Sequence, residues 1–73
     1  MRTEWYWNDR AELARRAECS PQLISALFNN RKAVSRKMAT RIADAAEEMN
    51  IAVTRLDCLY PEETNNPLFG DEK

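Results

Sequence analysis

Most side chains able to do chemistry in this sequence carry charge, and their signs are separated along the chain. Eight basic residues stand between Arg10 and Arg41 against Glu12 and Glu18, which gives this half a net charge of +6. From residue 42 onward two basic residues stand against eight acidic ones, although the whole chain carries only −1. This separation predicts that the basic half faces a polyanion. The acidic half would then repel the polyanion and prevent it from docking on the wrong side of the protein. The alternative is that the charges only solvate the outer faces of helices.

The remaining polar residues do not suggest catalysis. The sequence has no histidine, no glycine-rich phosphate loop and no nucleophile beside a base, so we expect no enzyme activity. Cys19 and Cys58 lack the short ligand spacing of a zinc site, and we expect no metal, no cofactor and no small-molecule ligand. In a reducing compartment, two buried free thiols are favoured over a disulfide.

The length of the chain implies one small domain that must pack tightly. A chain of 73 residues buries only roughly 60 % of the surface it would expose unfolded, so helix packing or a partner subunit must supply stability. No run approaches the ~20 apolar residues of a membrane helix, and the N-terminal residues lack a signal-peptide core. We therefore expect a cytoplasmic protein of a bacterium or a phage-infected cell, with no membrane contact.

Helices are predicted from apolar spacing and from side chains that can cap exposed amide groups. Asn8 or Asp9 would cap the first helix, and Ser20 would cap the second, with Pro21 at its first position. Ser35 would cap the third helix, and Thr54 with Asp57 would form a capping box at the start of the fourth. The helices then cover about residues 9–18, 21–29, 36–49 and 55–60, with Asn29-Asn30 as a left-handed cap of the second. The sequence therefore predicts an all-α fold, a compact bundle of four to five short helices.

Apolar side chains lie near both ends of the predicted bundle, and the sequence alone does not decide what they pack against. Trp5 and Trp7 would share one face of an extended segment, and would cover an edge of the core or form a dimer contact. In the last helix, we expect Leu56, Cys58 and Leu59 to form the packing side.

The C-terminal residues differ in composition from the rest. Residues 1–61 are predicted to form the domain, and the polar residues 62–73 a flexible tail. Leu68 and Phe69 are the only anchors in that tail, and would dock on the core or on a second subunit.

The first two predicted helices carry a recognisable arrangement of small and apolar residues. From Leu13 to Leu27 the sequence reads L-A-x-x-A-x-C-S-x-x-x-I-S-x-L. It resembles the phage Cro/CI-type (XRE-like) repressor family, whose run is leucine, alanine, two polar residues, apolar, glycine, apolar, serine, then isoleucine-serine. The resemblance covers about residues 9–60. This chain has Glu18 where the family usually has glycine, and its short N-terminus is more similar to that of the lac-repressor headpiece.

The resemblance implies a lambda-repressor-like DNA-binding domain, with a helix-turn-helix whose second helix, about residues 21–29, lies in the major groove of double-stranded DNA. The implied base contacts are Gln22, Ser25, Ala26 and Asn29. The Gln22 amide would bond adenine N6 and N7 together. The implied phosphate contacts are Ser20, Asn30, Arg31, Lys32, Arg36 and Lys37.

The function expected from these features is sequence-specific DNA binding by a small, repressor-like transcriptional regulator. We expect a homodimer on a near-palindromic operator, and the candidate dimer contacts are Trp5, Trp7, Leu59 and Phe69. The alternative is a protein-interaction module, such as an antitoxin or a regulator-binding helical bundle.

Overall fold

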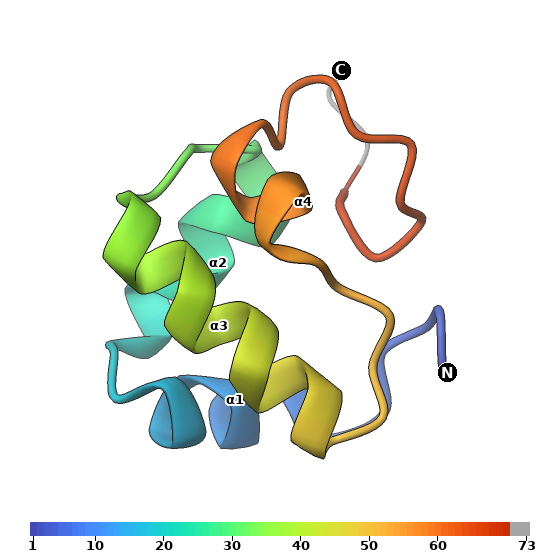
Figure 1. Cartoon of the computed structure of the whole chain (residues 1–73). Helices are drawn as coiled ribbons and strands as arrows, with labels where there is room; N and C mark the ends of the chain where they lie inside the picture. Colours follow the sequence, from blue (N-terminus) through green and yellow to red (C-terminus); the bar gives the residue numbers. More distant parts are fainter. Residues whose placement is uncertain (71–73) are drawn as a thin grey trace.

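The computed structural model describes residues 1–70, and within that range it contains four helices and no strand (Figure 1). The helices are α1 (Asp9–Ala17), α2 (Pro21–Asn30), α3 (Arg36–Glu48) and α4 (Arg55–Leu59). α1 packs against both α2 and α3, and α3 packs against α4. The all-α prediction is confirmed, and the predicted helices differ from the observed ones by one residue at their C-terminal ends. None of these helices is both long and apolar enough to span a bilayer.

Three of the four helices begin at the predicted capping side chains. The hydroxyl of Ser20 accepts from the Leu23 amide at 3.2 Å, and Ser35 caps α3 in the same way. Thr54 and Asp57 form the predicted capping box, with both hydrogen bonds at 3.2 Å. These caps satisfy amides that the first helical turn leaves without intrahelical partners.

The start of α1 differs from the prediction, because neither candidate side chain caps the helix. Asn8 stands at the cap position in a left-handed conformation, and its side chain makes no capping bond. The Asp9 carboxylate instead accepts from the Tyr6 amide at 2.7 Å and from the Arg2 guanidinium at 2.6 Å. The hydrogen bond from Arg2 holds the pKa of Asp9 below its usual range, so this charge fixes the N-terminal segment.

The turn between α1 and α2 places Glu18 in the conformation that glycine adopts without strain. Its φ is 61° and its ψ is 44°, a left-handed geometry that costs an L-residue roughly 1–2 kcal/mol. Glu18 donates its amide to the Arg15 carbonyl, and the next amide, of Cys19, bonds the Ala14 carbonyl at 3.0 Å. The C-terminal end of α1 therefore keeps its capping hydrogen bonds, although glutamate is an unfavourable residue type at this position.

Replacing Glu18 with glycine should stabilise the fold by about 0.5–1 kcal/mol, because glycine removes the left-handed strain but loses more backbone entropy on folding. Urea denaturation of Glu18→Gly and of the native chain measures the difference. The matched control is Glu18→Ala, which loses the long 3.8 Å contact to Arg41 but keeps the strain. If Glu18→Ala stabilised the fold as much as Glu18→Gly, the charge of Glu18 and not its backbone conformation would be the cause of the destabilisation.

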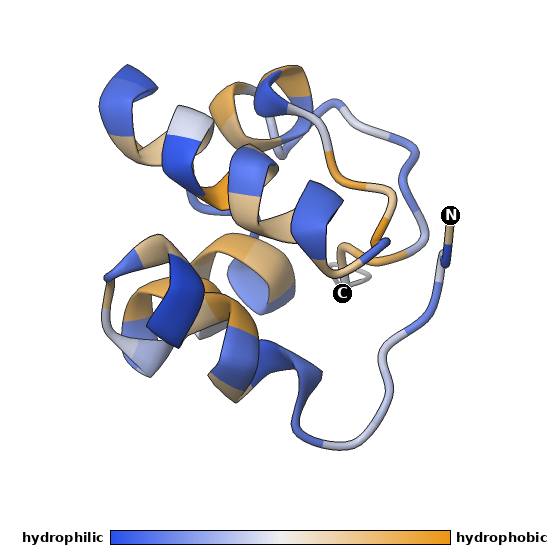
Figure 2. Ribbon diagram, turned by 60° about the horizontal axis from the view of Figure 1, so that its bottom comes forward, coloured by the Kyte–Doolittle hydropathy of each residue, from blue (hydrophilic) through white to orange (hydrophobic). Residues whose placement is uncertain are grey.

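The core lies between the helices and is formed by their apolar faces. Figure 2 shows apolar stretches of the ribbon turned inward and polar stretches outward. The fully buried side chains include Leu13 of α1, Ile24, Leu27 and Phe28 of α2, and Ile42 of α3. Their i, i+3, i+4 spacing explains why the helix positions could be predicted from the apolar pattern.

The sequence predicted a flexible tail from residue 62 with Leu68 and Phe69 as its anchors, and in the structure these two anchors dock on the core. Leu68 and Phe69 are buried, and the rings of Phe69 and Phe28 lie 4.6 Å apart. Trp5 packs edge-on against Phe28 at 4.9 Å and donates its indole N–H to the Leu68 carbonyl at 2.9 Å. Residues 71–73 of the predicted tail lie outside the described part of the chain.

A small polar network holds this C-terminal segment on α4. The Asp57 carboxylate accepts from the hydroxyl of Thr64 at 2.7 Å and from the amide of Asn66 at 2.8 Å. The Asn66 amide also bonds the Ala52 carbonyl at 2.6 Å. Burial raises the pKa of Asp57, but these hydrogen bonds outweigh it and leave the pKa below its usual value.

The two cysteines should differ strongly in reactivity. Burial raises the pKa of Cys58 to about 12, whereas Cys19 is half-buried and its pKa is raised less by the same cause. Because the thiolate is the reactive form, a disulfide reagent at pH 8 should modify Cys19 first. Cys58 should react much more slowly than a free thiol, because little of it is thiolate and the buried sulfur is inaccessible. Mass spectrometry of the Cys19→Ser and Cys58→Ser chains assigns each site. Rapid modification of Cys58 in the folded chain would contradict its burial.

Candidate nucleic-acid interface

α1 packs against α2, and two small residues of α1 are buried. Ala14 and Ala17 of α1 are 2 % and 1 % exposed, and side chains of this size allow two helix backbones to approach closely. The connection between the helices is three residues long, Glu18 to Ser20. α2 is therefore held rigidly on one side and presents its opposite side to solvent.

The outward face of α2 is polar and uncharged. Gln22, Ser25 and Asn29 are exposed, and Ala26 is half-buried beside them. Residues at i, i+3 and i+7 lie along one side of a helix, so the three polar side chains form one row. The structure brings together the four predicted base contacts on this face, which we call the α2 face.

Exposed basic residues follow the α2 face along the chain. Lys32 lies in the loop after α2, and Arg36 and Lys37 occupy the first turn of α3; all three are exposed. Cations in a first turn oppose the helix dipole, so helix stability does not explain their position. No Asp or Glu lies between Glu18 and Asp44 in the sequence, although the exposed Glu62 and Glu63 line a hollow with Arg31, the neighbour of Lys32.

Arg31, one of the predicted phosphate contacts, is hydrogen-bonded within the chain. Its guanidinium donates to the carbonyl oxygens of Gly70 at 2.7 Å, Pro61 at 2.9 Å and Thr64 at 3.0 Å. It also takes the left-handed position after α2, with φ 53°, which the sequence assigned to Asn29-Asn30. The three hydrogen bonds hold Arg31 in this geometry, so α2 continues through Asn30 and ends against the C-terminal segment.

The other basic residues of this half are engaged elsewhere. Glu12 pairs with Arg15 and Arg16, and Arg16 also reaches Glu48 of α3 at 3.0 Å. Arg10 lies over the Trp5 ring, with 5.0 Å between the guanidinium carbon and the ring centre. Within residues 1–70, by contrast, Lys32, Arg36 and Lys37 form no salt bridge. These three are therefore the basic side chains best placed to meet an anionic ligand.

Two further predicted phosphate contacts lie at the two ends of α2. Ser20 is exposed at its N-terminus, where its oxygen caps the Leu23 amide and its hydroxyl hydrogen can still donate. Asn30 is exposed in the last turn. Both side chains therefore border the α2 face.

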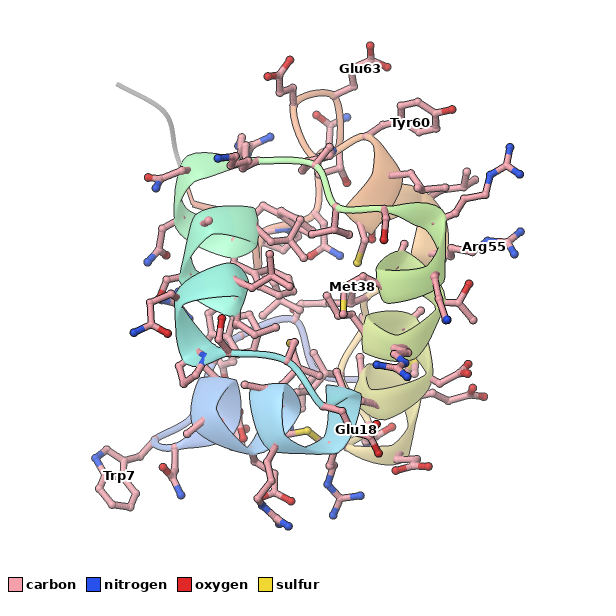
Figure 3. All side chains as sticks on the ribbon, turned by 90° about the vertical axis from the view of Figure 1, so that its left-hand side faces the viewer. Trp7, Glu18, Met38, Arg55, Tyr60 and Glu63 are labelled. Carbon is pink, nitrogen blue, oxygen red and sulfur yellow. The ribbon has the colours of Figure 1, made fainter. Side chains whose placement is uncertain are left out.

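The four predicted dimer contacts differ in exposure, and only Phe69 is buried. Phe69 is only 3 % exposed, and Trp5 and Leu59 are half-buried against the core. Trp7 is 93 % exposed and projects from the molecule (Figure 3), so the two tryptophans do not share a face. The sequence analysis missed four large exposed apolar side chains: Met1 and Tyr6 near the N-terminus, and Leu56 and Tyr60 of the α4 region. Leu56 is therefore not on the packing side of α4 as predicted.

No group of three potential metal ligands comes together within residues 1–70. The chain matches no protein-family model, no curated protein and no solved structure.

Proposed function

We propose that this chain binds double-stranded DNA as a small, repressor-like transcriptional regulator, with α1 and α2 acting as a helix-turn-helix. The observation that carries the proposal is the α2 face, an exposed polar and uncharged row that is followed along the chain by the exposed Lys32, Arg36 and Lys37. A major groove is wide enough to admit one helix, and it displays donors and acceptors that uncharged polar side chains can read.

Base recognition on the α2 face would be shared between hydrogen bonding and apolar contact. The Gln22 amide can bond adenine N6 and N7, and Ser25 and Asn29 can each donate or accept along the groove. The half-buried Ala26 presents a methyl group between them, which suits a thymine methyl. No arginine lies on this face, so we do not expect the bidentate contact that reads guanine.

Affinity would come mainly from the phosphate backbone. Lys32, Arg36 and Lys37 contact phosphates without reading sequence, and Ser20 and Asn30 add hydrogen bonds from the ends of α2. The regulator would act by occupying its operator in the cytoplasm of a bacterial or phage-infected cell.

A second candidate function is a protein-interaction module, and the exposed Leu56, Tyr60 and Trp7 favour it. The two functions differ in their response to salt. Binding to DNA weakens steeply as salt rises, because neutralised phosphates release counterions, whereas burial of apolar side chains does not.

The decisive experiment is selection of bound duplexes from a random pool, because it tests DNA binding and reveals any half-site symmetry together. Enrichment of a defined sequence supports the proposal. The proposal would be rejected if no sequence were enriched and if the chain bound random duplex no more tightly than an unrelated acidic protein does.

In the selected duplex, Gln22→Ala should reduce discrimination at one or two base pairs by roughly 1–3 kcal/mol, since the amide that bonds the base edge is lost. Competition gel shifts with each single-base variant of the duplex measure the change. Asn65→Ala is the matched control, an exposed polar residue of the C-terminal segment. If Gln22→Ala discriminates as well as the native chain, Gln22 does not read bases.

A further inference from the structure

A small apolar hollow lies where α3 meets the segment that follows it. Its apolar lining comes from Ala43 of α3, from Ala52 and Val53 of that segment, and from Met1. Its volume is about 340 Å³, near the lower end of the range found for pockets that hold a ligand. We call this feature, together with the two carboxylates of α3 that also line it, the α3 hollow.

Backbone hydrogen bonds hold the walls of the α3 hollow together. The Arg2 amide donates to the Asn50 carbonyl at 2.8 Å, and the Ala52 amide donates to the Arg2 carbonyl at 2.8 Å. The Ile51 amide donates to the Ala46 carbonyl of α3 at 2.8 Å. Figure 1 shows the N-terminal segment running beside the chain that leaves α3. The hollow is therefore formed before anything binds, which lowers the ordering cost of binding.

The two carboxylates of the α3 hollow are Asp44 and Glu47. Both are exposed, and three residues along a helix place them on one side of α3. Neither forms a salt bridge within residues 1–70, whereas the adjacent Glu48 pairs with Arg16 at 3.0 Å. Like charges at this spacing repel, and Glu47 in the last turn opposes the helix dipole. Helix stability therefore does not explain these two charges.

The arginines nearest to the α3 hollow do not balance its charge either. Asp44 also borders a second hollow, which is lined by Arg16, Arg41, Glu18 and Glu48. There Arg16 contacts Glu48 at 3.0 Å and Arg41 lies 3.8 Å from Glu18. Each arginine thus already has an acidic partner. The charge of Asp44 remains in excess beside the α3 hollow.

We propose that the α3 hollow docks a segment of another protein in which aliphatic side chains are flanked by lysine or arginine. The aliphatic side chains would cover Ala43, Ala52 and Val53, and the cations would face Asp44 and Glu47. The same carboxylates would repel a phosphate backbone, so the occupant is not a nucleic acid. Among residues 1–70, no proposed DNA contact lines the hollow, so this partner and DNA would not compete for a residue.

Selection from a displayed library of random peptides tests the proposed chemistry without DNA, so its result does not depend on DNA binding. The native chain should enrich peptides with leucine, isoleucine or valine flanked by lysine or arginine. The chain with Asp44→Lys and Glu47→Lys should not enrich them. Lysines near the end of α3 suit the helix dipole, so circular dichroism should show unchanged helix content. Absence of a shared pattern, or the same pattern from the double variant, would overturn the proposal.

Titration with a blocked synthetic peptide, Lys-Arg-Leu-Leu-Arg-Lys, tests the location by NMR. Amide resonances of Ala43, Glu47 and Val53 should shift and saturate, whereas those of Gln22 and Ser25 should not move. Because the surface is small, we expect a dissociation constant between ~10 μM and ~1 mM. Replacing both leucines of the peptide with serine should raise this constant at least ~tenfold, since the apolar burial is lost.

A matched pair of charge variants separates the α3 hollow from general attraction to acidic residues. Asp44→Lys with Glu47→Lys should raise the dissociation constant for the leucine peptide at least ~tenfold. Glu62→Lys with Glu63→Lys changes the charge by the same amount at two exposed positions outside the hollow, and should leave the constant nearly unchanged.

Three results of the titration would overturn the proposal. The first is the absence of saturable shifts at the α3 hollow up to ~10 mM peptide. The second is equal affinity for the leucine and serine peptides, which would reduce the contact to charge alone. The third is an equal loss of affinity in both pairs of charge variants.

Discussion

Replacing Lys32, Arg36 and Lys37 together with alanine should lower the affinity for every duplex alike, by roughly 10²–10³-fold near 0.1 M salt. Each lost phosphate contact reduces the slope of log K against log salt by about 0.9, so the triple variant should have a slope flatter by up to ~2.7. The three side chains are exposed and form no salt bridge within residues 1–70, so the fold should not change. Fluorescence anisotropy with a labelled duplex at several salt concentrations measures both quantities.

The control for this prediction is Arg15→Ala. Arg15 is also exposed and basic, but it pairs with Glu12 on α1 at 2.6 Å, away from the first turn of α3. Its loss should leave the salt slope nearly unchanged. If the triple variant keeps the native slope, or if Arg15→Ala flattens it equally, the ligand-facing charge does not lie beside the α2 face.

Replacing Arg31 with alanine should destabilise the fold by about 2–4 kcal/mol. One guanidinium satisfies three carbonyl oxygens from Pro61, Thr64 and Gly70, and hydrogen bonds to charged groups contribute roughly 1.5–3 kcal/mol each before partial exposure is discounted. In a domain of this size each kcal/mol lowers the melting temperature by about 4–8 °C. Thermal and urea denaturation measure the loss.

Two variants separate this structural role from simple charge. Lys32→Ala removes the neighbouring positive charge, which is exposed, and should change stability little. Arg31→Lys keeps the charge, but an ammonium lacks the planar fork that reaches several carbonyls, so most of the loss should remain. Full stability of Arg31→Lys would show that charge alone holds the segment.

The features that could be predicted from the sequence are those decided by near neighbours. Ser20, Ser35 and the Thr54–Asp57 pair each cap an amide three residues away, so local sequence contains both partners. The apolar spacing of α2 and α3 likewise depends only on helical geometry. The left-handed position of Glu18 was implied by the family resemblance, in which glycine usually stands at this place in the turn.

The features that the sequence did not reveal depend on residues far apart in the chain. Arg31 differs from the other basic residues only through carbonyls more than 29 positions away, and nothing in its local sequence marks that role. Leu68 and Phe69 were predicted as anchors of a polar segment, but their partners Phe28 and Trp5 lie far away in the chain and could not be named. For α4, five residues give too few turns for an apolar stripe to be recognised, so the packing side was assigned wrongly to Leu56.

Helix periodicity predicted where the site residues lie on the helices. It did not predict which of their side chains are free to contact a ligand. The row of Gln22, Ser25 and Asn29 on one side of α2 is a matter of spacing. Whether a basic residue is exposed or engaged, as in Lys32 and Arg31, depends on the C-terminal segment that packs beside them.

The packing of Trp5 and of residues 68–70 around Phe28 also bears on the order in which the chain folds during synthesis. Phe28 lies near the end of α2, and its carbonyl oxygen accepts the Gly70 amide. A ten-residue helix is marginal by itself, so α2 gains its final support only when both of these distant segments have docked. On the ribosome, the proposed DNA-contacting helix would therefore remain incomplete until residue 70 has emerged from the exit tunnel.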